Sequence, residues 1–158
     1  MTHNELNEMR IKMKQMKKEY EEVIQKFGKE MFNFETKELF ENNPKLTSFA
    51  WSQYTPYFND GDECTFRVRR DYCLTLNRTG ESLDRYEVDY WKDPEYEYTP
   101  DPKDYNCDSI DELISIVEGI DKVLDLFEDD DLSLMFGDHA EITVFRDGRI
   151  DIDSYDHD

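Results

Sequence analysis

The strongest constraint on this chain is a heptad pattern of apolar residues near its N-terminus. Seven side chains recur at alternating steps of three and four, which places them on one face of a helix; they are Leu6, Met9, Met13, Met16, Tyr20, Val23 and Phe27. Flanking Glu and Lys residues form oppositely charged i, i+4 pairs such as Glu8–Lys12. We therefore expect a helix from Asn4 to about Phe40, with a bend or a second helix start near Gly28, ended by the Asn42-Asn43-Pro44 tripeptide.

This apolar seam has two possible partners. Methionine side chains adapt to many surfaces, so the three Met residues of the seam specify a partner poorly. A seam of three heptads is also short for an independent coiled coil. We therefore expect the seam to pack on the chain's own sheet. The alternative is a self-associating coiled coil, which would make the protein a homo-oligomer.

The charge is distributed very unevenly along the chain. Residues 1–50 contain nine basic and nine acidic side chains, whereas residues 51–158 contain ten basic and thirty acidic ones, so the whole net charge of −20 lies in the second part. The acids also change from Glu, which favours helix, to mostly Asp, which favours caps and turns. The sequence predicts a helical arm at 1–43 and an acidic body at 44–158, within one folding domain.

The body has strand, helix and hairpin signals in turn. Alternating apolar residues predict strands at 46–57, 64–76 and 86–90, the first two joined by an Asn59-Asp60-Gly61 turn. Ser109 and Glu112 form a capping box that opens an amphipathic helix to Phe127. We expect four acids at its end, 128–131, and a further turn at 132–136, before a hairpin of strands at 140–145 and 149–155. This order predicts an α+β fold with an antiparallel sheet of about five strands.

No motif for catalysis, metal binding or cofactor binding is present. The chain has no phosphate-binding loop and no G-x-S-x-G or H-E-x-x-H sequence. A thiol–imidazole pair of His139 with Cys64 or Cys107 is conceivable, but a lone histidine and scattered cysteines are usually structural. The Asp147 to Asp153 region lacks calcium-loop spacing. We expect no enzymatic activity, no metal and no cofactor.

The same composition predicts a cytoplasmic protein. Three cysteines, an odd number without zinc spacing, fit reduced thiols. No apolar run approaches the roughly 18–20 residues of a membrane helix, and the N-terminus lacks a signal-peptide pattern. We also expect no direct nucleic-acid binding by residues 51–158, since thirty acids repel phosphates.

The acidic strands are the candidate binding surface. In the last strand Asp151 and Asp153 alternate with isoleucines that we expect to face inward, and carboxylates two residues apart on a strand lie about 6.6–6.8 Å apart. Such a row resembles phosphates on a nucleic acid and would fit an Arg/Lys groove of another protein. The predicted binding residues are the acids of the strands and nearby tyrosines that would anchor an interface: Glu87, Asp89, Glu95, Tyr96, Glu97, Tyr98, Asp151 and Asp153.

Outward acids also have a simpler explanation, since they keep the edge of a sheet soluble and unpaired. A net charge of roughly 2–8 in magnitude is enough for that purpose in a small domain. The value of −20 exceeds it and adds self-repulsion. The excess favours a functional acidic surface.

The segment from Trp51 to Phe66 resembles a motif, W-x-Q-Y-T-P-Y-F-N-D-G, of small acidic proteins of tailed phages and bacteria. That family carries no assigned catalytic residue, and the resemblance implies only a phage or bacterial origin. We expect the aromatic rings of this motif to lie in the core. The general character is similar to that of phage-encoded inhibitors of host defence.

These observations leave three hypotheses. The leading one is a non-enzymatic, phage-encoded inhibitor and nucleic-acid mimic that docks on a basic surface of a host nucleic-acid-binding or defence protein. The second is an oligomeric assembly protein built on the N-terminal helix. The third is a small-ligand binder or enzyme with an unrecognised site.

Overall fold

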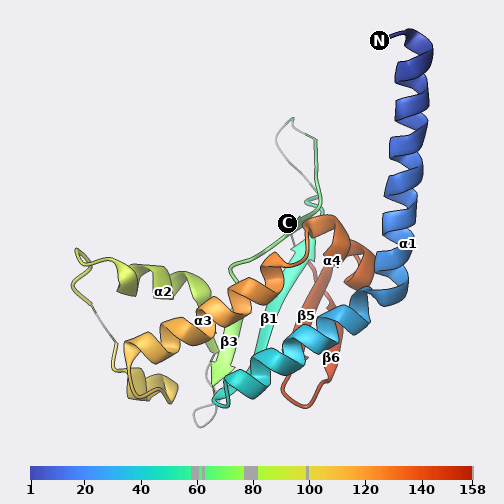
Figure 1. The fold of residues 1–158 in the computed structure, drawn as a ribbon. Helices are drawn as coiled ribbons and strands as arrows, with labels where there is room; N and C mark the ends of the chain where they lie inside the picture. The colour runs from blue at the N-terminus through green and yellow to red at the C-terminus, as the bar shows by residue number, and fades with distance from the viewer. Residues whose placement is uncertain (58–60, 62, 77–81, 99, 158) are drawn as a thin grey trace.

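A single helix forms the first quarter of the molecule. The structure, a computed structural model, describes residues 1–57, 61, 63–76, 82–98 and 100–157. Helix α1 spans His3–Asn42 and begins with a capping box, in which the Thr2 hydroxyl accepts from the Glu5 amide and the Glu5 carboxylate accepts from the Thr2 amide. The predicted helix is confirmed. Figure 1 shows that it changes direction near its middle, so that its first half projects away from the rest of the molecule.

The body is an antiparallel sheet, and the α+β class predicted from the sequence is confirmed. In the described part of the chain the strands number six: β1 (Leu46–Tyr54), β2 (Arg67–Val68), β3 (Cys73–Leu76), β4 (Ser82–Asp84), β5 (Ala140–Phe145) and β6 (Ile150–Ser154). The order is β4-β3-β1-β5-β6, with β2 pairing on one end of β1. The predicted turn at 59–61 lies partly outside the described residues.

Three helical segments cover one face of this sheet (Figure 1). They are the second half of α1, α3 (Ile110–Asp125) and α4 (Asp129–Phe136). Between the two layers lies a core rich in aromatic rings, in which Phe32 contacts Trp51 and Phe136 edge to face at centroid distances of 5.9 and 5.3 Å. The predicted apolar face of α3 is buried in this core.

Of the described rings in the aromatic motif, Trp51 is buried in this core and Phe66 packs against it half-buried, whereas Tyr54 lies half-buried on the other face of the sheet. The buried Gln53 side chain accepts from Trp51 Nε1 at 2.9 Å and donates to the carbonyls of Leu132 and Gly137 at 2.9 and 2.7 Å. One amide thus links β1 to helix α4, through Leu132, and to Gly137, the residue that follows the helix. Tyr57 differs from the expectation, because its ring is exposed.

The prediction of a strand at 86–90 is wrong. These residues belong to helix α2 (Arg85–Lys92), and strand β4 precedes it at Ser82–Asp84. Arg85 explains the difference: it binds Asp89 one helical turn away at 2.7 Å and Asp121 of α3 at 2.9 Å. These two ion pairs of Arg85 hold α2 against α3. The alternating tyrosines in the sequence do not indicate this contact. The following segment contains a short helix, η1 (Pro102–Tyr105).

The acids after α3 also have a different role from the one expected. They open α4 rather than follow the end of α3, since Glu128 is the N-cap and the Asp131 carboxylate accepts a hydrogen bond from the Glu128 amide. Acids in a first turn are favourable for the helix dipole. Arg70 joins the two helices by donating to the carbonyls of Leu124 and Phe127 and to the Asp129 carboxylate.

The expectation that the heptad seam packs on the sheet is wrong. The face of α1 that meets the body is a different one and comprises Ile24, Gly28, Phe32, Thr36, Leu39 and Phe40. Its residues recur mainly every four positions, where the bend turns the second half of the helix onto α3 and α4. Gly28 is needed there, because a Cβ would lie 2.9 Å from Cγ of Met135.

Candidate functional site: the open face of the sheet

The sheet face opposite the helices gathers acidic and small side chains from five strands. Residues directly opposite each other in antiparallel strands point to the same side. The pairing register therefore aligns one row across the whole sheet, formed by Asp84, Cys73, Ala50, Thr143 and Asp151. A second row contains Ser52, Glu141 and Asp153. We call this surface, with its two rows, the open face.

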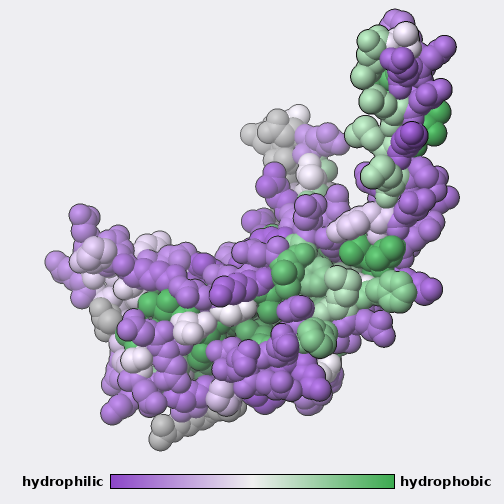
Figure 2. All heavy atoms as spheres, in the orientation of Figure 1, coloured by the Kyte–Doolittle hydropathy of each residue, from purple (hydrophilic) through white to green (hydrophobic). Residues whose placement is uncertain are grey.

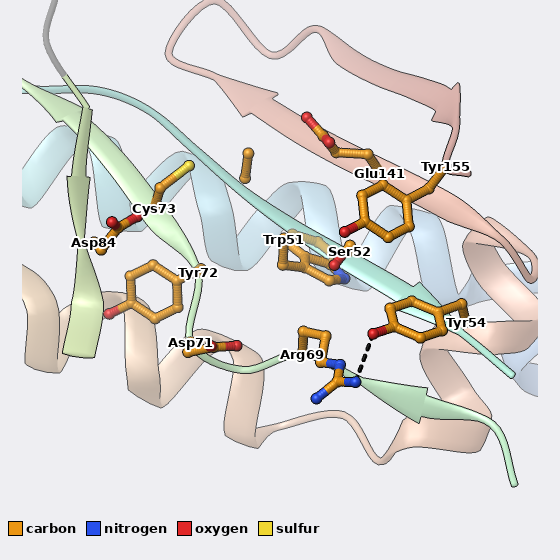
Figure 3. A pocket seen from close by; sticks show the side chains of 11 residues that line it. Trp51, Ser52, Tyr54, Arg69, Asp71, Tyr72, Cys73, Asp84, Glu141 and Tyr155 are labelled. Atoms are coloured by element: carbon orange, nitrogen blue, oxygen red, sulfur yellow. Dashed lines mark hydrogen bonds between the residues drawn. The ribbon is translucent and has the colours of Figure 1, made fainter. Parts of the chain in front are cut away.

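The middle of the open face is shallow and its borders are acidic. Ala50, Ser52 and Cys73 are small residues of the central strands and form the floor of a depression. Figure 3 shows Cys73 beside Asp84 on one side of that depression and Glu141 beside Tyr155 on the other. A groove with a floor of short side chains and carboxylates along its borders can accommodate long cationic side chains.

Aromatic residues close one end of the groove. The Tyr54 hydroxyl accepts from Arg69, whose guanidinium also lies 4.9 Å from the Tyr54 ring centroid (Figure 3). Tyr54 stacks on His157 at 3.9 Å and on Tyr155 at 5.5 Å. His157 Nε2 lies 2.7 Å from Nδ1 of His139. The cluster holds the C-terminal segment against β1 and forms one end of the groove.

Like charges face each other across β5 and β6. Glu141 lies directly opposite Asp153, and both side chains are exposed. Directly opposed like charges destabilise a sheet. Among the ion pairs between described residues, Arg149 meets Asp151 at 3.5 Å, but no cation meets Asp84, Glu141 or Asp153. The open face therefore holds carboxylates that form no ion pair with a cation of the described residues.

The carboxylates of the open face affect the pKa of the Cys73 thiol. Burial raises the pKa of Cys73, and the carboxylates of Asp84 and Glu141 raise it further, against two backbone hydrogen bonds that lower it. Asp84 on β4 and Glu141 on β5, which are three places apart in the strand order, thus both act on the Cys73 sulfur. Carboxylates from both sides of the groove floor therefore act on the Cys73 thiol.

The eight predicted binding residues do not form one surface. Asp151 and Asp153 lie on the open face, on edge strand β6. Glu87 and Asp89 lie on α2 rather than on a strand, beyond the opposite edge strand β4. Asp89 is also paired with Arg85 of the same helix, on the surface of the protein. The set splits because the third strand was predicted in the wrong place.

The remaining four predicted residues follow α2. Tyr96 packs against Tyr90 of that helix, with ring centroids 5.3 Å apart, and Tyr98 is largely exposed. Glu95 and Glu97 are exposed neighbours of these rings. The segment is therefore a second acidic region, separate from the open face.

Sequence reasoning missed Glu141, Asp84 and Cys73, although a signal for Glu141 was present. Ala140, Ile142 and Val144 alternate with it and face the core. Pairing the last two strands about their tight turn would have placed Glu141 opposite Asp153. Ile152, expected to be inside, is 46% exposed because β6 is an edge strand that the helices do not cover.

The thiol–imidazole pair considered above is not assembled. Cys107 is buried in the core, where burial first and then the Glu112 and Asp108 carboxylates raise its pKa to about 11, despite the opposing charge of Lys45. His139 is instead engaged with His157 and stacks on Tyr57. No group of three or more metal-ligating side chains converges within the described ranges.

Comparison with known proteins adds no assignment. No protein-family model, curated protein or solved structure matches this chain. The resemblance to phage and bacterial proteins stays a prediction. Among the described residues, no helix combines the length and apolar character needed to cross a bilayer.

Proposed function

We propose that this protein is a non-enzymatic binding protein whose open face takes up a basic segment of another protein. The observation that supports this most directly is the strand register, which aligns Asp84, Glu141, Asp151 and Asp153 around a floor of small side chains. Glu141 and Asp153 repel each other in the free protein. A bound cation would remove that repulsion.

The spacing on β6 suits an extended basic peptide. Asp151 and Asp153 are two residues apart, so their side chains lie about 6.6–6.8 Å apart along the strand. Alternate side chains of an extended peptide have the same spacing. A segment with Lys or Arg at every second position would therefore place each cation near one carboxylate.

A nucleic-acid-binding protein is the class of partner that this charge pattern favours. Such proteins carry Arg/Lys grooves that hold phosphates, and occupation of the groove would inhibit nucleic-acid binding. The phage origin and the host target remain predictions that follow from the resemblance of the Trp51 motif and from the charge.

Titration with an octa-arginine peptide tests the proposal. Binding would be measured by isothermal titration calorimetry at several salt concentrations, with wild type, the face variant Glu141→Gln/Asp153→Asn and the control variant Glu95→Gln/Glu97→Gln. Both variants remove two exposed charges, so non-specific attraction changes equally. We expect the face variant to bind about three- to tenfold more weakly, with a smaller salt dependence, and the control to bind nearly as wild type.

Equal weakening in the two variants would show that only total charge matters and would overturn the open face as the site. Stronger loss in the control would move the site to the region after α2. Circular dichroism checks that each variant is folded, which we expect because all four side chains are exposed.

A further inference from the structure

Among the described residues, the apolar side chains of the heptad seam of α1 stay largely exposed, and the hydrogen bond from the Tyr20 hydroxyl to Asp131 is a polar contact at its end. Met9, Met13 and Met16 are 50%, 69% and 67% exposed, and Figure 2 shows apolar surface along the projecting half of the helix. Even where the helix meets the body, the seam residues Val23 and Phe27 remain 49% and 42% exposed. A continuous apolar face of this length is unfavourable in water.

We propose that a second copy of this chain covers the seam, and that the two copies pair antiparallel over residues 2–27. Leu6, Met13 and Tyr20 occupy heptad position a, and Met9, Met16 and Val23 occupy position d. In an antiparallel pair, a residues face d residues. One alignment pairs all six of these residues with apolar partners: Leu6 on Val23 of the partner subunit, Met13 on Met16 of the partner subunit, and Tyr20 on Met9 of the partner subunit.

The charges flanking the seam select this orientation. In an antiparallel pair, position g faces g, and the g residues are Glu5, Lys12, Glu19 and Lys26. The alignment above sets Glu5 against Lys26 of the partner subunit and Lys12 against Glu19 of the partner subunit, which by symmetry makes four attractive contacts. The e positions disfavour this alignment, because Arg10 faces Lys17 of the partner subunit. By symmetry this repulsive contact occurs twice.

A parallel pair has no such advantage. There each g residue faces the e residue five positions further along the other helix. Glu5 would attract Arg10 of the partner subunit, but Lys12 would repel Lys17 of the partner subunit. The attractive and repulsive contacts cancel.

The charge of the bodies favours the same orientation. The chain beyond residue 50 carries the net charge of −20, whereas residues 1–50 are neutral. A parallel pair would bring two bodies side by side. The antiparallel alignment places them at opposite ends of an overlap of about 25 residues, roughly 37 Å long at about 1.5 Å per residue. That exceeds the Debye length of about 8 Å at physiological salt.

Tyr20 is already positioned for this contact. Its hydroxyl donates to Asp131 of α4 at 3.0 Å, while 52% of the residue stays exposed. The polar end is thus satisfied within the chain, and the ring is free to meet a sulfur atom of the other copy, a favourable contact.

Sedimentation equilibrium of the full chain tests the pairing. Wild type is expected to dimerise, and Met16→Glu is expected to be monomeric with an unchanged circular dichroism signal in the body. Lys12→Glu separates the orientations, because it opposes Glu19 of the partner subunit in the antiparallel pair but attracts Lys17 of the partner subunit in a parallel one. We expect it to raise the dimer Kd at least about fivefold.

Two further variants complete the test. Lys12→Glu/Glu19→Lys is expected to restore the wild-type Kd, and Lys18→Glu, the same charge change at an outward f position, to leave it near wild type. A monomeric wild type at high micromolar concentration would overturn the proposal, as would tighter association of Lys12→Glu or equal loss in Lys18→Glu. Octa-arginine binding is measured separately on Met16→Glu, so failure here leaves the open face untouched.

Discussion

Glu141 and Asp153 lie directly opposite each other on β5 and β6, with both carboxylates exposed on the open face. Two like charges in that position oppose sheet formation. The repulsion between the two carboxylates therefore lowers the stability of the free protein. It also gives the proposed function a measurable signature.

Neutralising this pair should stabilise the free protein. Asp153→Asn removes the repulsion across the strands, and we expect the free energy of unfolding to rise by about 0.2–1 kcal/mol. Urea denaturation at low salt measures it, with Glu97→Gln as a control that removes an exposed charge elsewhere. A loss of stability in Asp153→Asn alone would show that the two carboxylates do not oppose each other.

A cation introduced into the floor of the groove should compete with the basic partner for the carboxylates. Ala50→Lys would place an ammonium group between Cys73 and Thr143, near the acidic borders of the groove. We expect octa-arginine binding to weaken at least about tenfold while the protein stays folded. Ala50→Gln is the matched neutral control, and calorimetry is the readout. If the two variants bound alike, blocked space rather than charge would account for the loss.

Arg70 should be important for the stability of the body. Its guanidinium donates to the carbonyls of Leu124 and Phe127 at the end of α3, both at 2.9 Å, and to Asp129 at 2.8 Å. Arg70→Met leaves these acceptors without their donor, and we expect a loss of about 1–3 kcal/mol in the free energy of unfolding. Arg67→Met, at an exposed position on β2, should change little in the same urea titration.

The buried Gln53 should be hard to replace. Gln53→Leu keeps the volume but leaves Trp51 Nε1 and the carbonyls of Leu132 and Gly137 unsatisfied. We expect a loss of about 2–4 kcal/mol, measured by thermal or urea unfolding. Gln53→Glu is a useful comparison, since it keeps one acceptor for Trp51 but loses both donors. A stable Gln53→Leu would contradict the role of this amide in joining β1 to α4 and to the residue after it.

Acid should weaken the contact between Asp138 and Thr55. Partial burial acts to raise the pKa of Asp138, but hydrogen bonds from the Thr55 hydroxyl and amide and from the His139 amide outweigh it and lower the pKa. A carboxyl with a lowered pKa stabilises the fold above its unfolded pKa of about 3.9 and loses that contribution as the pH falls through the folded value.

The stability difference between wild type and Asp138→Asn should therefore be largest near neutral pH and shrink below about pH 4. Urea titrations between pH 7 and pH 2 measure it, and Asp104→Asn, in the exposed η1 helix, serves as the control. A constant difference across this range would mean that the Asp138 hydrogen bonds do not depend on its charge.

Much of the fold could be predicted because its signals are local. The helix α1, its end before Pro44, the amphipathic helix opened by Ser109 and the final hairpin each follow from spacing or from a single cap. The predicted strand at 86–90 failed because an alternating pattern over five residues does not exclude a helix. The fork from Arg85 to Asp89 and Asp121 joins parts of the chain that are more than thirty residues apart, and no local pattern reveals it.

The candidate site could be predicted only in part, and the reason is geometrical. Asp151 and Asp153 were found because alternation marks the outward side of one strand. Their neighbours Glu141 and Asp84 depend on which strands pair and in which register, and those choices are made by the core between the sheet and the helices.

The amino-acid sequence by itself determined the charge of each part of the chain, the helical periodicity of the arm and the class of the fold, because these depend on composition and on neighbours within a few positions. Only the tertiary structure decided which face of α1 is buried and which acids share a surface. Both depend on the packing of residues far apart in the chain, where Ile24, Gly28 and Phe32 fit against the body and leave the seam exposed.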